Sequence, residues 1–232
     1  MKSKILIIIP AYNEEENLVN VVDNIIENYS DYDYVVVNDG SIDNTRNICI
    51  KKGYNYVDYP VNQGLTSAFR GGVYYALEND YQYIIQCDAD GQHDPKYIKE
   101  MLNKAICQKS DVVIGSRYIG NKKPFSFRML GSRILSLCIL LITRKRITDP
   151  TSGMRLYNHR TMKIIYSKKY FGPEPDTLVH LLKCRMKVVE IPVKMGERLL
   201  GTSYLNITNS IKYMLHMCFS IIIVENFRKK GQ

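Results

Sequence analysis

The first half of the chain alternates short apolar, β-branched runs with longer stretches in which apolar positions recur at helical spacing. Such alternation is typical of a parallel, doubly wound sheet in an α/β protein. The expected strands are Lys4–Ile9, Tyr34–Asn38, Tyr54–Asp58, Tyr83–Cys87 and Asp111–Gly115, and the expected helices are Asn13–Asn28, Asn44–Lys52, Thr66–Glu78 and Pro95–Gln108.

Two helix starts carry recognisable capping patterns. Asn13 with Glu16 three residues later matches a capping box, and Asp94 before Pro95 places proline in the first turn of a helix. We therefore expect the first of these helices to begin at Asn13.

Beyond about residue 120 the pattern changes, and we expect these segments to build the far wall of a site in the same domain. We assign residues 1–204 to that domain and residues 205–232 to a C-terminal amphipathic helix with a basic tail. The expected elements are a basic helix at Phe125–Ile142, a turn at Asp149–Gly153, a strand at Met154–Tyr157, a helix at Asp176–Met186, a strand at Lys187–Lys194 and a final helix from about Leu205.

Two apolar runs, Ile134–Ile142 and Met217–Val224, each lead into basic residues. Both are shorter than the roughly 18 to 20 apolar residues of a membrane-spanning helix. They fit core helices that end in basic residues, and they also fit interfacial helices on an anionic bilayer. The N-terminal run, Ile5–Ile9, ends at Pro10 without a cleavage site, so we expect a buried strand and not a signal peptide.

Composition narrows the class of protein. A chain of 232 residues that is 45% hydrophobic and 24% charged is neither disordered nor a multi-span membrane protein. The net charge of +9 suits nucleic acid, an anionic membrane or a phosphorylated substrate. No RNA-binding motif or basic recognition helix is present, so nucleic acid is not an expected partner. Six scattered cysteines without a CxxC pair indicate a reducing, cytosolic compartment.

Polar residues gather where the expected strands end, which is where open α/β sheets bind ligands. Pro10–Glu14 follow the first strand, Asn38–Ser41 the second and Asp88–His93 the fourth. Neither GxGxxG nor GxxxxGK[ST] occurs, which argues against a dinucleotide fold and a P-loop. The sequence therefore predicts a nucleotide site of another type.

Asp88 and Asp90 lie two residues apart after a buried strand, and Gln92 adds a third oxygen. An oxygen-only set suits Mg²⁺ or Mn²⁺, although a solvated acidic turn has the same composition. Asp39 can accept a hydrogen bond from a base or a ribose hydroxyl, or it can belong to an ordinary turn in which Gly40 has positive φ.

Four arginines are embedded in turns or helix starts, whereas the other basic residues occur in runs. A guanidinium matches phosphate geometry and stays charged, so embedded arginines suit phosphate binding. For any one of them taken alone, a structural salt bridge is the simpler interpretation. The four are Arg117, Arg128, Arg155 and Arg198.

These pieces together resemble glycosyltransferase family 2, which has the GT-A fold, a Rossmann-like and mostly parallel sheet flanked by helices. The resemblance is carried, in the family's order, by IIIPAYNEEENL, VVVNDGSIDNT, NQGLTSAFRGGVYYAL, DADGQHDPKYI, GSRY, DPTSGMRLYN and IPVKMGERLLGTS. DADGQH, Phe127-Arg128 with Ser132, and DPTSGMR are most similar to the polyprenyl-phosphate branch, which includes dolichyl-phosphate mannose synthase and bacterial undecaprenyl-phosphate glycosyltransferases.

The resemblance implies a role for each matching residue. Pro10, Tyr12, Glu14, Asp39 and Asp88 would bind the nucleotide, and Asp88, Asp90 and Gln92 would bind Mg²⁺ or Mn²⁺. Arg117, Arg128, Arg155, Arg198 and Ser203 would bind the acceptor and phosphates. Asp176, Glu174 and Arg128 would be the catalytic residues.

The same resemblance implies an inverting, metal-dependent transfer from a nucleotide-diphosphate sugar, with a UDP-sugar favoured, to a polyprenyl phosphate for cell-surface polysaccharide synthesis. A lipid phosphate has a second pKa of ~6 and needs no general base. The alternative acceptor is a sugar hydroxyl of a lipid-linked oligosaccharide, for which Asp176 would be the base. The stretch after Arg198 lacks the lysine that many members carry, which weakens the case for phosphate binding there.

The resemblance also favours a membrane role for the C-terminal helix. We expect a cytoplasmic protein that is peripheral on the inner face of the cell membrane, held by that helix and its basic end or by a small membrane protein. Homo-oligomerisation stays open. Rival interpretations are a sugar-nucleotide pyrophosphorylase, which would need a Gly-rich, Arg-bearing loop after the first strand, and a catalytically inactive membrane adaptor.

Overall fold

The isoleucine-rich run near the N-terminus forms a strand that is buried on both faces. Ile5, Ile7 and Ile9 enter one hydrophobic cluster, whereas Leu6 and Ile8 enter another on the opposite face. Side chains of a strand alternate between faces, so an unbroken apolar run is the pattern of a strand between two helical layers. This strand therefore lies in the interior of the sheet.

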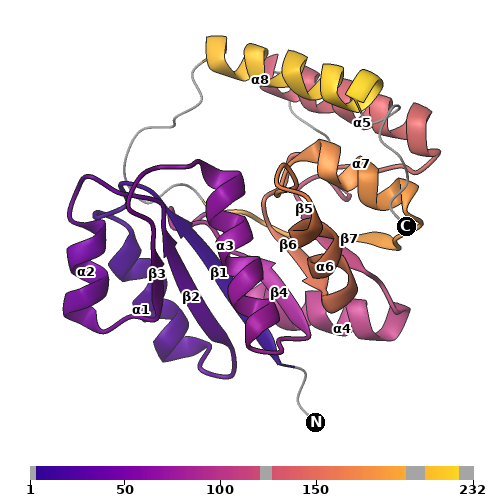
Figure 1. Cartoon of the computed structure of the whole chain (residues 1–232). Coiled ribbons are helices and arrows are strands. Elements are labelled where there is room, and N and C mark those ends of the chain that lie inside the picture. Colours follow the sequence, from indigo (N-terminus) through magenta and orange to yellow (C-terminus); the bar gives the residue numbers. More distant parts are fainter. Residues whose placement is uncertain (1–3, 121–126, 197–206, 225–232) are drawn as a thin grey trace.

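The computed structural model of the chain describes residues 4–120, 127–196 and 207–224. Its seven described strands form one sheet in the order β3-β2-β1-β4-β6-β5-β7 (Figure 1). Only β6 runs against its neighbours, β4 and β5, and the other pairs are parallel. The strands are β1 (Ile5–Ala11), β2 (Asp33–Asn38), β3 (Tyr56–Asp58), β4 (Tyr83–Gln86), β5 (Val112–Ser116), β6 (Arg155–Asn158) and β7 (Val188–Pro192).

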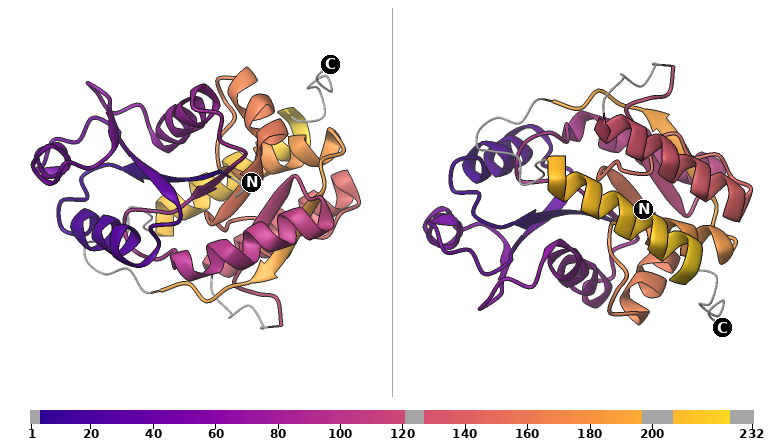
Figure 2. Two further views of the ribbon diagram at one scale, coloured as in Figure 1. Left: turned by 90° about the horizontal axis from the view of Figure 1, so that it is seen from below. Right: turned by 90° about the horizontal axis from the view of Figure 1, so that it is seen from above.

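Helices cover both faces of this sheet (Figure 2). One face carries α1 (Leu18–Asn28), α2 (Thr45–Lys52) and α4 (Ile98–Gln108), the last preceded by a short 3₁₀ turn at Pro95–Tyr97. The other carries α3 (Leu65–Glu78), α5 (Phe127–Thr143), α6 (His159–Ser167), α7 (Pro175–Lys183) and α8 (Ile207–Phe219), the last followed by a π-helical turn at Ser220–Val224. The predicted α/β fold with a mostly parallel sheet is confirmed.

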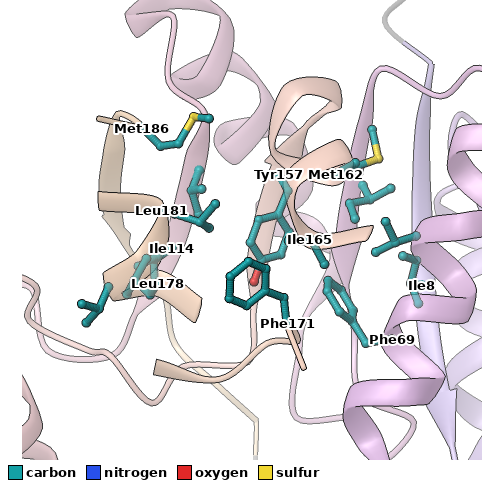
Figure 3. Packing of buried hydrophobic residues seen from close by; sticks show 14 of the residues in the cluster. Ile8, Phe69, Ile114, Tyr157, Met162, Ile165, Phe171, Leu178, Leu181 and Met186 are labelled. Carbon is teal, nitrogen blue, oxygen red and sulfur yellow. The ribbon is translucent and has the colours of Figure 1, made fainter. Parts of the chain in front are cut away.

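The larger core cluster joins the two halves of the chain (Figure 3). Phe69 of α3 and Tyr157 of β6 have ring centroids 5.7 Å apart, and Phe171 lies beside them before α7. Met217 and Ile221, from α8 and the turn after it, are buried in the same cluster. The C-terminal helix is thus packed into the core of the domain.

The capping box predicted at Asn13 is wrong. Asn13 has a left-handed φ of 55°, and α1 begins only at Leu18. The Asn13 backbone N–H donates to Oγ of Ser41 at 3.0 Å, and the Ile42 N–H donates to Oδ1 of Asn13 at 3.0 Å. These bonds to the loop after β2 hold Asn13 outside the helix. Asp94 does cap its turn, since its side chain accepts from the Lys96 N–H.

One helix, α6, was not predicted. Its sequence does carry a helix start, because Oδ1 of Asn158 accepts from the Thr161 N–H at 2.9 Å. Met162 and Ile165, three residues apart, form its buried side. The other boundaries differ from prediction by a few residues; β3 starts at Tyr56 and α7 spans Pro175–Lys183.

Candidate active site

A cavity of about 490 Å³ opens where β1, β2 and β4 end. Because these strands are parallel, their carboxyl ends meet at one edge of the sheet. All five residues predicted to bind nucleotide lie on its wall together with the second aspartate of the acidic pair. The lining residues are Pro10, Ala11, Tyr12, Glu14, Asp39, Asn62, Gly64, Leu65, Ala68, Asp88, Ala89 and Asp90.

Asp39 fastens one wall of the cavity. Its Oδ1 and Oδ2 accept the backbone N–H groups of Gln63 and Gly64 at 2.9 and 2.8 Å. The loop can approach this closely because Gly40 has a φ of 65° and a Cβ there would lie 2.3 Å from the carbonyl carbon of Val61. These two hydrogen bonds hold the loop before α3 at the cavity wall.

The predicted metal ligands lie on one turn after β4. Asp88 and Asp90 both line the cavity, and Oδ1 of Asp90 accepts the backbone N–H of Gln92 at 3.0 Å. Gln92 is half-buried beside them, and its carbonyl accepts the Gly196 N–H at 2.9 Å. No group of three or more His, Cys, Asp or Glu converges within the described residues.

Two buried side chains hold Asp88. Gln86 was not predicted, whereas His93 forms a hydrogen bond, which is the more common role of a histidine in a loop before a helix. Gln86, the last residue of β4 and 1% exposed, donates from Nε2 to Oδ1 of Asp88 at 2.8 Å. Nδ1 of His93 accepts the Asp88 backbone N–H at 3.0 Å, so its proton lies on Nε2, which is 3.7 Å from Oδ2 of Asp88. A Cβ on Gly153 would lie 3.0 Å from Cε1 of His93. The carboxylate is thereby oriented before any ligand binds.

Asn62, Gly64, Leu65 and Ala68 also line the cavity and were not predicted as site residues. They lie in the segment NQGLTSAF, which the resemblance already included. The positive φ of Gly64, 87°, marks the sharp turn that starts α3 at the cavity. That glycine before a helix was the available sequence indication.

Arg117 is held by Asp149, a fully buried residue. Nε and Nη2 of Arg117 donate to the two carboxylate oxygens at 2.7 Å each, and Nη2 also donates to Oγ1 of Thr151. Burial opposes the charge of Arg117, but the hydrogen bonds and charge of Asp149 outweigh burial and raise its pKa. Nη1 makes no hydrogen bond within the described part of the chain, and the side chain is 24% exposed.

Arg155 is 1% exposed and bonded to backbone carbonyls. Its guanidinium donates to the oxygens of Ser152 at 2.9 Å, Pro150 at 2.6 Å and Glu174 at 3.4 Å. This arrangement holds the loop before β6 against the start of α7. It supports a positioning role for Arg155 and offers no open edge to a phosphate.

The acidic pair at the start of α7 is also bonded within the protein. Oε2 of Glu174 accepts from the Tyr213 hydroxyl, and Oδ2 of Asp176 accepts from Oγ of Ser220 at 2.8 Å. Oδ1 of Asp176 accepts the Thr177 N–H at 2.7 Å. Burial raises the pKa of Glu174, and the Tyr213 hydrogen bond opposes part of that rise. Neither carboxylate is among the residues that line the cavity.

Three predicted residues cannot be placed. Arg198 and Ser203 lie outside the described residues, as does the side chain of Arg128. The last residue described before the segment that carries Arg198 and Ser203 is Gly196, next to the acidic turn.

Residues 6–165 match the sequence family described as glycosyl transferase family 2. The undecaprenyl-phosphate mannosyltransferase of Micrococcus luteus is 29% identical over 213 residues, covering 86% of each chain. A UDP-N-acetylglucosamine–dolichyl-phosphate N-acetylglucosaminyltransferase of Methanococcus voltae is 29% identical, covering 82% of this chain and 84% of its own.

Similar solved structures share the fold. Glucosyl-3-phosphoglycerate synthase from Mycobacterium tuberculosis, crystallised with Mn²⁺ and UDP-glucose, superimposes with a TM-score of 0.65. It is 17% identical, and the match covers 99% of this chain and 82% of the other.

Proposed function

Because this chain belongs to glycosyl transferase family 2, we propose that it transfers a sugar, with inversion, from a nucleotide-diphosphate sugar to a polyprenyl phosphate. The observation that carries the proposal is the cavity at the carboxyl edge of β1, β2 and β4, which brings four predicted nucleotide residues together with the acidic pair Asp88 and Asp90. The named activities of the relatives support a lipid-phosphate acceptor. Synthesis of cell-surface polysaccharide is the process that such a product would supply.

The donor nucleotide would lie between the ends of β1 and β2. Tyr12 is 40% exposed at the cavity, and its ring offers a face for a base. Asp39 would accept a hydrogen bond from a base N–H or a ribose hydroxyl, and Pro10 and Glu14 complete the wall. We favour a uridine nucleotide, because an acceptor at Asp39 suits the N–H of uracil.

A divalent cation, Mg²⁺ or Mn²⁺, fits the acidic turn. Asp88 and Asp90 supply oxygen ligands that face the cavity, and Gln92 lies on the same turn. Two carboxylates are too few for an all-protein cage, but Mg²⁺ is commonly held by one or two carboxylates together with substrate phosphates. When bound, the ion would offset the negative charge of the leaving diphosphate.

The acceptor phosphate would meet a basic wall. Arg117 presents Nη1 while Asp149 fixes the rest of its guanidinium, and Arg128, Arg198 and Ser203 are further candidates from the resemblance. A lipid phosphate is already ionised near neutral pH. Both carboxylates at the start of α7 accept hydrogen bonds from protein donors, which supports a positioning role over proton abstraction. A sugar-hydroxyl acceptor would instead require Asp176 as a base.

A two-helix surface would bring the site to the membrane. Helices α5 and α8 lie side by side at one end of the molecule (Figures 1 and 2). No helix within the described ranges is long and apolar enough to cross a bilayer. Each of the two nevertheless exposes a stripe of large apolar side chains at helical spacing. The stripes are Leu130, Ile134, Leu137 and Leu141 on α5, and Leu215, Phe219, Ile222 and Ile223 on α8 and its π-helical turn.

Exposed cations flank this apolar face, including Lys212 and the run Arg144–Arg146 after α5. Apolar stripes edged by basic residues match an anionic lipid surface. We propose that the enzyme lies on the inner face of the cell membrane.

A product assay tests the proposed reaction. Purified protein is incubated with Mn²⁺ or Mg²⁺, undecaprenyl phosphate and each of a panel of UDP- and GDP-sugars. The lipid extracts are then analysed by mass spectrometry. A lipid with one added hexose or N-acetylhexosamine is the expected result. Metal-dependent nucleotide release without a lipid product would favour a hydroxyl acceptor, and no turnover with any donor would refute the proposal.

Flotation with anionic liposomes tests the membrane face. Leu137→Glu with Phe219→Glu should abolish flotation, because both side chains are more than half exposed on the proposed contact surface. Ile106→Glu on α4 is the matched control, since Ile106 is 46% exposed on the opposite helical layer. Equal flotation of both variants would overturn the assignment.

A further inference from the structure

The C-terminal helix makes polar contacts with the two carboxylates that precede and begin α7. The Tyr213 hydroxyl of α8 donates to Oε2 of Glu174, and Oγ of Ser220, one residue past α8, donates to Oδ2 of Asp176 at 2.8 Å. Each carboxylate thus has its own donor from the C-terminal segment. Tyr213 and Ser220 are seven residues apart, two helical turns, so both face α7.

The segment that bears these donors is anchored by packing. Met217 and Ile221 are 6% and 0% exposed in the core cluster that also holds Leu178 and Val179 of α7. Gly131 of α5 allows close approach, since a Cβ there would lie 2.4 Å from Cε of Met214. The inner side of α8 is therefore fixed in place, while its outer side carries the apolar stripe.

The acidic pair is connected to the cavity through two contacts. Arg155 donates both to the Glu174 carbonyl and to the Ser152 carbonyl, and the next residue, Gly153, lies against Asp88 and His93. On the other side, Gly172 packs against Thr66, next to the cavity residue Leu65. A shift of Glu174 or Asp176 would thus reach both the acidic turn and the start of α3.

We propose that Tyr213 and Ser220 are positioning residues for sugar transfer: they hold the carboxylates of Glu174 and Asp176, and with them the packed segments that support the acidic turn and the start of α3. This inference rests on the proposed glycosyl transfer but not on its lipid acceptor. It makes the C-terminal helix a part of the active site, in addition to its surface on the membrane. Removing that helix should therefore disable catalysis even with a soluble acceptor.

The test deletes each hydroxyl separately. Tyr213→Phe and Ser220→Ala should each lower kcat about 10-fold, because losing a hydrogen bond to a charged group corresponds to a rate change of about that size. The KM for the donor should stay constant. Ser220→Thr keeps a hydroxyl and should restore most of the loss. Tyr54→Phe is the matched control, because Tyr54 donates to Asp23 at 2.5 Å on the other side of the sheet.

Two readouts separate positioning from a structural role. Liposome flotation and the KM for the donor should not change in Tyr213→Phe or Ser220→Ala. In Tyr213→Phe the pH profile of kcat should shift upward, because Glu174 loses the hydrogen bond that lowers its pKa; among the described residues its other ionisable neighbours are Arg155, Asp176 and His216. Activity that falls only as far as the folded fraction falls would overturn the inference.

The positioning role can be tested even if the acceptor is not a lipid phosphate. If wild-type protein forms no lipid product but hydrolyses the donor, the same variants are compared by rate of nucleotide release. Positioning predicts the same loss of kcat there. Unchanged nucleotide release in both variants would refute the inference, whatever the acceptor proves to be.

Discussion

Polar residues that follow β1, β2 and β4 face a shared cavity, whereas those around β5, β6 and α7 are bonded to the protein itself. In the first region Asp39 and Asp88 line the cavity, and each carboxylate also accepts hydrogen bonds from the protein. In the second, Arg155 and Asp176 are hydrogen-bonded within the protein and lie outside the cavity lining. The first region is built to meet a ligand, and the second to hold a wall in place.

The difference follows from strand direction. β6 is antiparallel to β4 and β5, so the segment before it returns across the carboxyl edge of the sheet. Such a returning loop must be fastened. Glu190 of β7 accepts the N–H groups of Thr148 and Asp149 at 2.8 and 3.0 Å, and Asp149 in turn holds Arg117. Some residues that the sequence suggests as ligands, such as Arg117, are thus held in hydrogen bonds that fix the loop before β6.

The largest expected effect is the loss of turnover when a carboxylate of the cavity is replaced. Asp90→Asn should lower turnover by roughly 10³-fold, because stabilisation of leaving-group charge is worth several kcal/mol. Thermal unfolding should show an intact fold. Asp94→Asn is the matched control on the same segment, since Asp94 caps the adjacent turn outside the cavity lining. Full turnover in Asp90→Asn would contradict the view that the cavity region, and not the region around β5, β6 and α7, binds the metal and donor.

Arg155→Met tests the anchoring side. The change leaves buried carbonyls without donors, so we expect the free energy of unfolding to fall by about 3 kcal/mol. For a chain of this size the midpoint should fall by roughly 6 to 12 °C. Arg160→Met, at an exposed position on α6, should change stability little. An Arg155→Met variant of native stability with a raised acceptor KM would instead make Arg155 a phosphate ligand.

Gln86→Leu tests how Asp88 is oriented. Loss of the 2.8 Å hydrogen bond should weaken Mn²⁺ binding 10- to 100-fold, the usual effect of removing a residue that orients a metal ligand. The measurement is a Mn²⁺ titration by electron paramagnetic resonance with UDP present. Gln82→Leu, exposed just before β4, provides the control. Equal Mn²⁺ affinities in wild type and Gln86→Leu would mean that the hydrogen bond from Gln86 does not orient Asp88 for metal binding.

Glu174→Gln should have the smallest effect on thermal stability, and that effect should depend on pH. Burial raises the folded-state pKa of Glu174, so ionisation costs stability once the pH exceeds the ordinary carboxyl value. Below that value both states hold the proton and the penalty vanishes. The variant should therefore melt at a higher temperature than wild type at pH 7 and at nearly the same temperature at pH 4. A higher wild-type midpoint at pH 7 would contradict this.

Local patterns predicted most elements and missed others for identifiable reasons. The apolar run Ile5–Ile9 and the proline after Asp94 carry their structure in a few neighbouring residues. Asn13 failed because its partners, Ser41 and Ile42, come from another loop. Helix α6 was missed although Asn158 caps it, because its short periodicity is weak.

The same division applies to the candidate site. Motifs at strand ends indicated Asp39, Asp88 and Asp90, because parallel strands bring their carboxyl ends together without further information. Gln86 could not be found from sequence, since a buried glutamine at a strand end has no distinctive pattern, whereas His93 belongs to the polar motif after the fourth strand and was expected to form hydrogen bonds. Their roles depend on distances to Asp88.

The sequence by itself determined the alternating α/β fold, the position of the cavity and the family of the enzyme, because these depend on periodicity and on short motifs of adjacent residues. The tertiary structure alone decided which arginine is buried and which keeps an exposed edge, and that α8 contacts Glu174 and Asp176. Tyr213 lies 39 residues beyond Glu174, and only the packing of Met217 and Ile221 into the core brings them together.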